Sequence, residues 1–241
     1  MLVTGGTRGI GRAIALRLAR AGASVVANYA RNDAAANALV ELARAESIAI
    51  DVLRADLTLA KGLAAARDKM AAVGRPPSLV HCAATGVHRP FAELTTRHWD
   101  WTMALNVRAF FELVGQMLPL FGEGSTILAV SSAGAARAVP AYAAVGASKA
   151  ALESLARHLA VELAPRGVRV NVLAPGSVAT EAWDAFPDRE QRLADVVRRS
   201  PLGRTVTLEE IACVAEFLCS PSSAGIVGQT LVVDGGARIV E

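Results

Sequence analysis

A glycine-rich segment near the start of the chain constrains the fold more than any other feature. Residues 4–11 read TGGTRGIG, follow a short β-branched run and open an Ala/Leu/Arg stretch of helical period. We expect Gly5 to allow a tight turn, Gly9 to let the backbone approach a phosphate, and Gly11 to let the helix pack closely on the strand. The free N–H groups at the helix start would face a pyrophosphate. The segment therefore predicts a dinucleotide-binding strand–turn–helix unit.

The rest of the chain repeats this alternation of short β-branched runs and longer helical stretches. The expected strands are 1–4, 24–29, 47–54, 77–83, 125–131, 168–174 and 229–233, and the expected helices are 9–21, 32–45, 60–73, 95–120, 141–164 and 206–219. Repeated strand–helix–strand units predict an α/β fold: a Rossmann-type, doubly wound parallel sheet of about seven strands with helices on both faces, a three-layer sandwich.

We expect residues 1–241 to form one domain. The segment 177–204 breaks the rhythm and is interpreted as a lid over the substrate cleft at the carboxyl ends of the strands. The first strand would hold only residues 1–4, so the natural start of the chain stays open.

Composition excludes several functional classes. Apolar residues make up 53% of the chain, enough for a large core, while a net charge of +3 without a basic run argues against nucleic-acid binding. Three cysteines without a C-x-x-C pair, and four histidines without ligand spacing, predict neither a disulfide framework nor a metal site. No apolar run reaches the roughly 18 residues of a membrane span, so we expect no membrane contact and a cytoplasmic location.

The end of the second expected strand indicates which dinucleotide is bound. An acidic residue there would bind the ribose 2′-hydroxyl of NAD and repel a 2′-phosphate. The sequence instead has Arg31 near this position, and Arg8 lies in the glycine loop, so two guanidinium groups can clamp a phosphate. Asp33 follows slightly too late to take the acidic role. The pattern predicts NADP(H).

The spacing T-G-x-x-x-G-x-G resembles that of the short-chain dehydrogenase/reductase family, and the resemblance covers nearly the whole chain. Further matches are Asp56, Asn106, Ser132, Lys149, residues 175–180 and residues 228–236. The residues that the glycine loop and the resemblance together assign to the NADP(H) site are Gly5, Thr7, Arg8, Gly9, Ile10, Gly11, Arg31, Asp56, Leu57, Ala83, Lys149, Pro175, Gly176, Val178 and Thr180.

The catalytic constellation departs from most of that family, in which a Tyr lies four residues before the Lys. Here Val145 holds that position, and the nearest tyrosine is Tyr142, seven residues before Lys149. On a continuous helix seven residues rise by about 10 Å. Either the phenol leans toward the cofactor, or the helix begins after Tyr142, which Pro140 favours.

The Tyr-x6-Lys spacing resembles the enoyl-acyl-carrier-protein reductases, specifically the branch that keeps an ordinary short-chain glycine loop. Residues 85–90, 98–106, 145–152 and 186–190 support this resemblance. It implies NADPH-dependent reduction of the 2,3 double bond of a trans-2-enoyl thioester, as in fatty acid synthesis. The carrier, either an acyl carrier protein or coenzyme A, stays open.

The resemblance also assigns catalytic roles. Tyr142 would donate a hydrogen bond to the enolate oxygen, and Lys149 would bind the ribose hydroxyls and lower the pKa of Tyr142. Ser132 would be a second donor, although the adjacent Ser131 could be the serine that faces the site. Asn106 is either part of a proton relay or a buried hydrogen-bonding residue.

Trp183 and Phe186 on the lid are the candidate contacts for the acyl chain. One departure concerns the backbone: residues 81–84 read HCAA where the family has NNAG, so Cys82 replaces an amide that binds neighbouring backbone.

Two other functions stay open. A ketoreductase would use Tyr142 as proton donor to a carbonyl, and a catalytically silent cofactor-binding scaffold would explain Val145 at the usual tyrosine position. The expected helix 141–164 carries a wider apolar stripe than one sheet contact needs, which predicts a homotetramer or homodimer. Arginines between 189 and 199 either meet an acidic carrier protein or form a solvated face.

Overall fold

A seven-stranded parallel sheet forms the centre of the molecule in the computed structural model, which describes residues 1–73, 76–178 and 189–240. The strand order is β3-β2-β1-β4-β5-β6-β7, and neighbouring strands pair in parallel. The strands are β1 Leu2–Thr4, β2 Val25–Tyr29, β3 Ile50–Arg54, β4 Leu79–His81, β5 Thr126–Val130, β6 Arg169–Pro175 and β7 Thr230–Val233. The predicted Rossmann-type, doubly wound sheet is confirmed.

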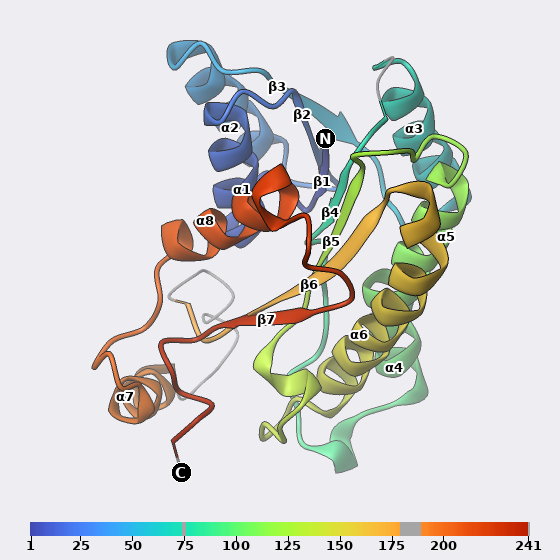
Figure 1. The fold of residues 1–241 in the computed structure, drawn as a ribbon. Coiled ribbons are helices and arrows are strands. Elements are labelled where there is room, and N and C mark those ends of the chain that lie inside the picture. Colours follow the sequence, from blue (N-terminus) through green and yellow to red (C-terminus); the bar gives the residue numbers. More distant parts are fainter. Residues whose placement is uncertain (74–75, 179–188, 241) are drawn as a thin grey trace.

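Helices cover both faces of the sheet, as predicted. Their bounds are α1 Gly9–Arg20, α2 Asp33–Ala45, α3 Ala60–Ala71, α4 Thr96–Met103, α5 Ala109–Met117, α6 Ala143–Leu163, α7 Arg189–Arg199 and α8 Leu208–Cys219. Figure 1 shows α1, α2 and α8 on one face and α3, α5 and α6 on the other. Among the described residues, no helix is long and apolar enough to cross a membrane.

The core has one large apolar layer on each face of the sheet, because parallel strands bury both of their faces. Phe110 and Leu152 pack against the sheet from α5 and α6, and Ile14 and Ile211 do so from α1 and α8. All four side chains are buried. These layers hold the helices at fixed distances from the strand ends, where the site lies.

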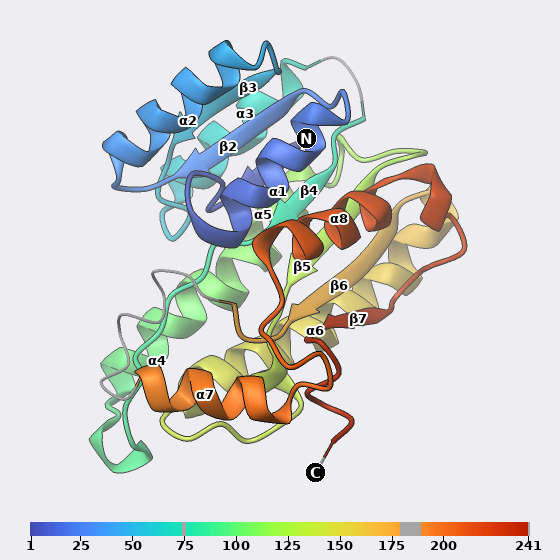
Figure 2. The ribbon, with the colours of Figure 1, turned by 90° about the vertical axis from the view of Figure 1, so that its left-hand side faces the viewer.

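Two elements differ from the sequence prediction. The expected helix 95–120 is divided into α4 and α5 by a π-helical turn at Ala104–Arg108. The segment interpreted as a lid contains α7, which has a helical period but in which charged and amide residues outnumber apolar ones, unlike the Ala/Leu-rich stretches that were expected to be helices. Figures 1 and 2 both show α7 beyond the carboxyl end of β6. Whether α7 acts as a lid stays a prediction.

Candidate active site

The glycine loop between β1 and α1 has the geometry that its sequence predicts. Gly5 and Gly9 have φ angles of +62° and +53°, in the left-handed region that favours glycine. A Cβ added to Gly11 would lie 2.1 Å from the carbonyl oxygen of Gly5, so only glycine allows α1 to approach the turn this closely. Each glycine therefore meets a different steric requirement.

The start of α1 is open toward an anion. Arg8, the N-cap residue, makes no side-chain capping hydrogen bond, and a Cβ added to Gly9 would meet no atom within 4 Å in the described part of the chain. The first turn holds no acidic residue. Free N–H groups at a helix start, with space before them and no competing carboxylate, fit the pyrophosphate of a dinucleotide.

Asp33, the acidic residue that follows Arg31 most closely in the sequence, is already engaged. Asp33 accepts a hydrogen bond of 2.9 Å from the Tyr29 hydroxyl and pairs with Arg54 at 3.2 Å. Arg8 and Arg31 are both exposed. The guanidinium groups of Arg8 and Arg31 are therefore accessible to a phosphate, while the Asp33 carboxylate is already paired with Tyr29 and Arg54.

Asp56, assigned to the NADP(H) site by the family resemblance, lies near Arg31. Its Oδ1 accepts hydrogen bonds from the Thr58 hydroxyl and backbone N–H, at 2.7 and 3.0 Å. These bonds, and to a smaller extent the charge of Arg31, lower the pKa of the Asp56 carboxyl. Arg31 and Asp56 come from the ends of neighbouring strands, so the topology brings two predicted cofactor residues together.

The remaining predicted cofactor residues lie in this region in different environments. Thr7, Leu57 and Val178 are buried, and Ile10 and Ala83 are half-buried. Pro175 ends β6, and Gly176 approaches Asp234 so closely that a Cβ added to the glycine would lie 2.6 Å from the Asp234 Cβ. Thr180, Trp183 and Phe186 lie outside the described residues. The cofactor and substrate roles of all these residues stay predictions.

Tyr142 lies immediately before α6, which resolves the two expectations for its spacing. The helix begins at Ala143 with Tyr142 as its N-cap, after Ala141 at a φ of +59°. Tyr142 therefore has a non-helical backbone conformation, and its side chain is not bound to the helical position two turns before Lys149. Its ring lies against Gly134, where an added Cβ would be 2.5 Å from the ring.

Ser132 is the serine that faces Tyr142. Its Oγ lies 3.2 Å from the Tyr142 hydroxyl and also accepts a hydrogen bond from the Gly134 N–H. The neighbouring Ser131 instead donates to the carboxylate of Glu153 at 2.6 Å. Adjacent residues leaving a strand point in opposite directions, which separates the two serines.

The pKa of Tyr142 corrects one expectation. We expected the charge of Lys149 to lower this pKa, but burial raises it, and the hydrogen bond with Ser132 is the opposing influence. Lys149 is not among the groups that shift the pKa of Tyr142. The phenol therefore stays protonated through the neutral pH range and can donate a hydrogen bond.

Lys149 is buried beside the end of β5. Its Nζ donates a hydrogen bond of 2.8 Å to the Val130 carbonyl oxygen, which takes one of the three ammonium donors. Burial lowers the pKa of Lys149 to about 8, opposed by Cys82 and Glu153. Burial also raises the pKa of the Cys82 thiol to about 11, so this cysteine is not an activated nucleophile.

Asn106 is fully buried within the π-helical turn. Its side chain accepts a 2.8 Å bond from the Thr85 N–H and donates to the Thr85 carbonyl and to the Ser148 hydroxyl, both at 2.9 Å. Of the two expected roles for Asn106, the structure shows that of a buried hydrogen-bonding residue. A part in proton relay stays a prediction.

Sequence reasoning missed three residues around this site. Thr4 Oγ1 accepts hydrogen bonds from the N–H groups of Cys82 and Ala83, so this hydroxyl binds the backbone of the segment in which Cys82 replaces the amide of the family. His81 contacts Thr4 from β4. The His88 ring stacks parallel to Tyr142, with centroids 5.4 Å apart. The HCAA segment was the available signal for His81.

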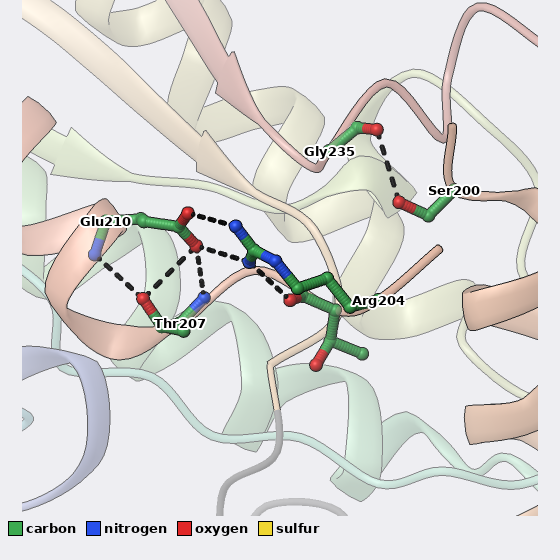
Figure 3. A network of polar contacts seen from close by, with 6 residues as sticks. Ser200, Arg204, Thr207, Glu210 and Gly235 are labelled. Carbon is green, nitrogen blue, oxygen red and sulfur yellow. Dashed lines mark hydrogen bonds and ion pairs between the residues drawn. The ribbon is translucent and has the colours of Figure 1, made fainter. Parts of the chain in front are cut away.

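A polar network anchors the end of the segment that contains α7 (Figure 3). Arg204 binds both oxygens of Glu210, at 2.9 and 2.6 Å, and Glu210 also accepts from the Thr207 N–H in a capping box at the start of α8. Ser200 donates to the Gly235 carbonyl oxygen at 3.2 Å. These contacts fix the connection between α7 and α8 to the loop after β7.

The chain is similar to known reductases along nearly its whole length. A family model described as Enoyl-(Acyl carrier protein) reductase matches residues 5–238. The 1-cyclohexenylcarbonyl-CoA reductase of Streptomyces collinus is 39% identical over 99% of this chain and 86% of its own length. A tropinone reductase homologue of Arabidopsis thaliana is 32% identical over 99% of this chain and 89% of its own.

Solved structures share the fold over nearly the whole chain. A gluconate 5-dehydrogenase from Burkholderia cenocepacia in complex with NADP and tartrate has a TM-score of 0.90 at 32% identity, covering 100% of this chain and 95% of that one. A dehydrogenase/reductase from Sinorhizobium meliloti has a TM-score of 0.91 at 32% identity, covering 98% and 94%.

Proposed function

Because the chain belongs to the short-chain dehydrogenase/reductase family, in the branch of the enoyl-(acyl carrier protein) reductase model, we propose that it reduces the 2,3 double bond of a trans-2-enoyl thioester with NADPH. Membership makes the chain an NAD(P)-dependent oxidoreductase. One observation carries the finer proposal: the hydroxyls of Tyr142 and Ser132 lie 3.2 Å apart just before the helix that holds Lys149.

The hydroxyl pair can stabilise the negative charge that this reduction creates. NADPH supplies the hydride for the β-carbon of the thioester, and charge then develops on the thioester oxygen. Tyr142, a phenol whose pKa burial raises further above the neutral range, donates a hydrogen bond to that oxygen, with Ser132 as a second donor. A proton from Tyr142 or water then completes the saturated thioester at the α-carbon.

Val145 supports the assignment of Tyr142 as the donor. This residue holds the usual tyrosine position, yet its side chain is buried and packs directly on Gly86, where an added Cβ would lie 2.1 Å from the Val145 Cγ2. The loop after β4 therefore fills the space that a tyrosine at this position would need. A phenol donor has to come from before the helix, where Tyr142 lies.

The substrate class follows from the relative in Streptomyces collinus. That protein is named for 1-cyclohexenylcarbonyl-CoA, a thioester whose double bond is conjugated with the carbonyl. The same conjugation is what makes hydride addition at a β-carbon possible. We propose that the acyl group of this chain's substrate is bound to coenzyme A or an acyl carrier protein.

A ketoreductase is the second candidate, because two hydroxyl donors 3.2 Å apart can also bind a ketone oxygen. The test supplies purified protein and NADPH with matched trans-2-enoyl and 3-ketoacyl thioesters, on coenzyme A and on acyl carrier protein, and follows NADPH absorbance. We expect turnover of the enoyl form. Turnover of the 3-ketoacyl form alone would replace the proposal, and tight NADPH binding without any turnover would favour a silent scaffold.

Arg31 tests the proposed preference for NADPH. We expect Arg31→Ala to raise KM for NADPH about tenfold or more, the scale of a lost charge-assisted contact with a phosphate, while KM for NADH changes little. Arg44→Ala, which removes a guanidinium from the last turn of α2, is the matched control. An unchanged ratio of the two KM values would mean that Arg31 does not contact the 2′-phosphate.

We also propose that the chain forms a homodimer or homotetramer through α4, α5 and α6. An open groove of about 1270 Å³ lies between these helices and is lined by Trp101, Phe111 and Leu155, among others. Trp101 and Phe111 are 45% and 61% exposed. An aromatic, exposed groove of this size is typical of a surface that a second subunit covers.

A further inference from the structure

Thr4 and His81 form a buried polar pair between the two central strands. They are register partners in β1 and β4, and neither side chain is exposed to solvent. The Thr4 Oγ1 lies 3.2 Å from the His81 Nδ1. The same oxygen accepts hydrogen bonds from the N–H groups of Cys82 and Ala83, at 3.1 and 3.0 Å. The pair therefore lies directly below the backbone that follows β4.

Counting donors assigns the tautomer of His81. A threonine hydroxyl has two acceptor positions and one proton, and the two backbone N–H groups take both acceptor positions. The Thr4 proton must then go to Nδ1 of His81, which is unprotonated. Burial and Lys149 lower the pKa of His81 to about 3, so the ring is neutral and its one proton is on Nε2.

Because Thr4 occupies the Nδ1 end of the ring, the interaction with Leu105 of the π-helical turn is assigned to the Nε2 end. Nε2 is buried and makes no hydrogen bond within the described residues. The Leu105 carbonyl is nevertheless near enough to raise the pKa of the ring, against the larger lowering by burial. Phe110 packs against the imidazole, with centroids 5.1 Å apart. A buried N–H donor held by packing close to a carbonyl is costly to leave unpaired.

Leu105 adjoins Asn106, whose side chain binds Thr85 and Ser148 beside Lys149. The His81 ring thus has one end under the Cys82–Ala83 backbone, next to the predicted cofactor position, and the other end at the turn that carries Asn106. A π-helical turn widens the helix and is common at functional sites. The turn at Ala104–Arg108 is held by contacts from outside the helix, such as those between Asn106 and Thr85. His81 lies where it can supply another contact of this kind.

We propose that His81 is a positioning residue that joins the cofactor loop to the π-helical turn, with Nδ1 ordering Thr4 and the Nε2–H directed toward the Leu105 carbonyl. The expected changes in kcat rest on the proposed function, because they refer to the reduction of an enoyl thioester. The hydrogen bonds proposed for His81 do not depend on that function. The two ends of the ring act on different steps, since Thr4 affects the cofactor loop and Leu105 affects the catalytic turn.

Two substitutions separate these ends. His81→Asn keeps a short acceptor for Thr4 but does not reach Leu105, whereas His81→Gln extends an amide N–H toward Leu105. We expect His81→Asn to lower kcat on the order of tenfold, the scale of one hydrogen bond, with KM for NADPH nearly unchanged. We expect His81→Gln to raise KM for NADPH about fivefold or more and to retain most of kcat.

A purely structural role would give another result. Both variants would then melt at lower temperature, and fewer sites per mole of protein would bind NADPH. The kcat per site and the KM for NADPH would stay at their wild-type values, and that outcome would overturn the proposal. Thr4→Ser, which keeps the hydroxyl, and Thr4→Val, which removes it, form the matched pair: only Thr4→Val should raise KM for NADPH.

The tautomer is tested without any substrate. In ¹⁵N-histidine-labelled wild-type protein at pH 7, the His81 signals should show a neutral ring with its proton on Nε2. The chain has four histidines, so the signals are assigned by their loss in His81→Asn, or by elimination with variants of His88, His98 and His158. A proton on Nδ1, or a doubly protonated ring, would overturn the inference even if the proposed reaction stands.

Discussion

At the scale of single residues, Tyr142 has the properties of a hydrogen-bond donor to a developing charge. Burial raises its pKa, and its hydroxyl is oriented toward Ser132. Tyr142→Phe keeps the ring against Gly134 and removes only the hydroxyl. We expect kcat to fall by roughly a hundredfold or more, the usual contribution of a positioned acid, and the Kd for NADPH to stay within about twofold.

Tyr29→Phe is the control, because the chain contains only these two tyrosines and Tyr29 binds Asp33 at the protein surface. At saturating NADPH its kcat should equal that of the wild type. Steady-state kinetics measures kcat for both variants, and a fluorescence titration measures the Kd of Tyr142→Phe for NADPH. A Tyr142→Phe enzyme that retains wild-type kcat would remove this phenol from the mechanism.

The lowered pKa of Lys149 predicts an alkaline limit to activity. The ammonium is present below about pH 8 and lost as the pH rises through that value, so kcat/KM for NADPH should fall above about pH 8. Lys149→Arg keeps a cation at all these pH values and should lose this limb of the profile, whatever its maximal rate. The same limb in the arginine variant would assign it to another group.

The same shift affects stability in the opposite direction. Between the native pKa of about 8 and the ordinary value of 10.5, the unfolded chain binds more protons than the folded one. The contribution of Lys149 to the free energy of unfolding therefore rises with pH across this window and is lost as the pH falls to about 8.

The residues of the site differ in how far the sequence could predict them. Pro140 favoured a helix that begins after Tyr142, because proline limits where a helix can begin, but the Tyr–Lys spacing alone left a second arrangement open. The choice between Ser131 and Ser132 could not be made, since it depends on which side of β5 each residue leaves, and Glu153 binds the one that turns away. His81 resembles any buried histidine until Thr4 is found beside it.

At the scale of elements, the capping box of α8 holds the connection to α7 in place. The Thr207 hydroxyl accepts a hydrogen bond from the Glu210 N–H, and the Glu210 carboxylate accepts one from the Thr207 N–H. We expect Thr207→Ala to lower the free energy of unfolding by about 1 kcal/mol, the usual cost of losing an N-cap, without changing KM for NADPH. Urea denaturation measures the first quantity.

Thr207→Ser retains a capping hydroxyl and should stay close to wild type. Equal loss of stability in the serine and alanine variants would point to the threonine methyl group, and not to the cap, as the stabilising feature.

Element bounds were predictable where the local sequence determines them, and not where tertiary contacts do. The glycine loop determines where α1 begins, and Thr207 with Glu210 does the same for α8. The π-helical turn was not predictable, because the apolar pattern continues through residues 95–120 and the turn is held by Asn106 binding Thr85 from another part of the chain.

At the scale of the whole molecule, one glycine turn and a regular alternation were enough to predict the architecture. A turn that carries a phosphate site requires a parallel strand before it and a helix after it, and repeated units of this kind pack as a doubly wound sheet. The sequence pattern does not predict which surface contacts another subunit, because an apolar helix face can belong to the core or to an interface.

The groove between α4, α5 and α6 makes the proposed assembly testable. Phe111 lines this groove and is 61% exposed in the single chain. In a two-fold interface each substitution occurs twice, so Phe111→Glu removes two buried phenyl groups and should weaken association by roughly a hundredfold or more. We expect sedimentation to show a lower mass for this variant than for wild type at the same concentration.

Ile239→Glu is the matched control, because Ile239 is 86% exposed near the chain end and does not line the groove. Its mass should equal that of the wild type. If Phe111→Glu and Ile239→Glu sediment alike, the groove is not the interface, and the exposed aromatic residues must have another role. If only Phe111→Glu dissociates while NADPH still binds, the helices that hold Asn106 and Lys149 are also the helices that assemble the enzyme.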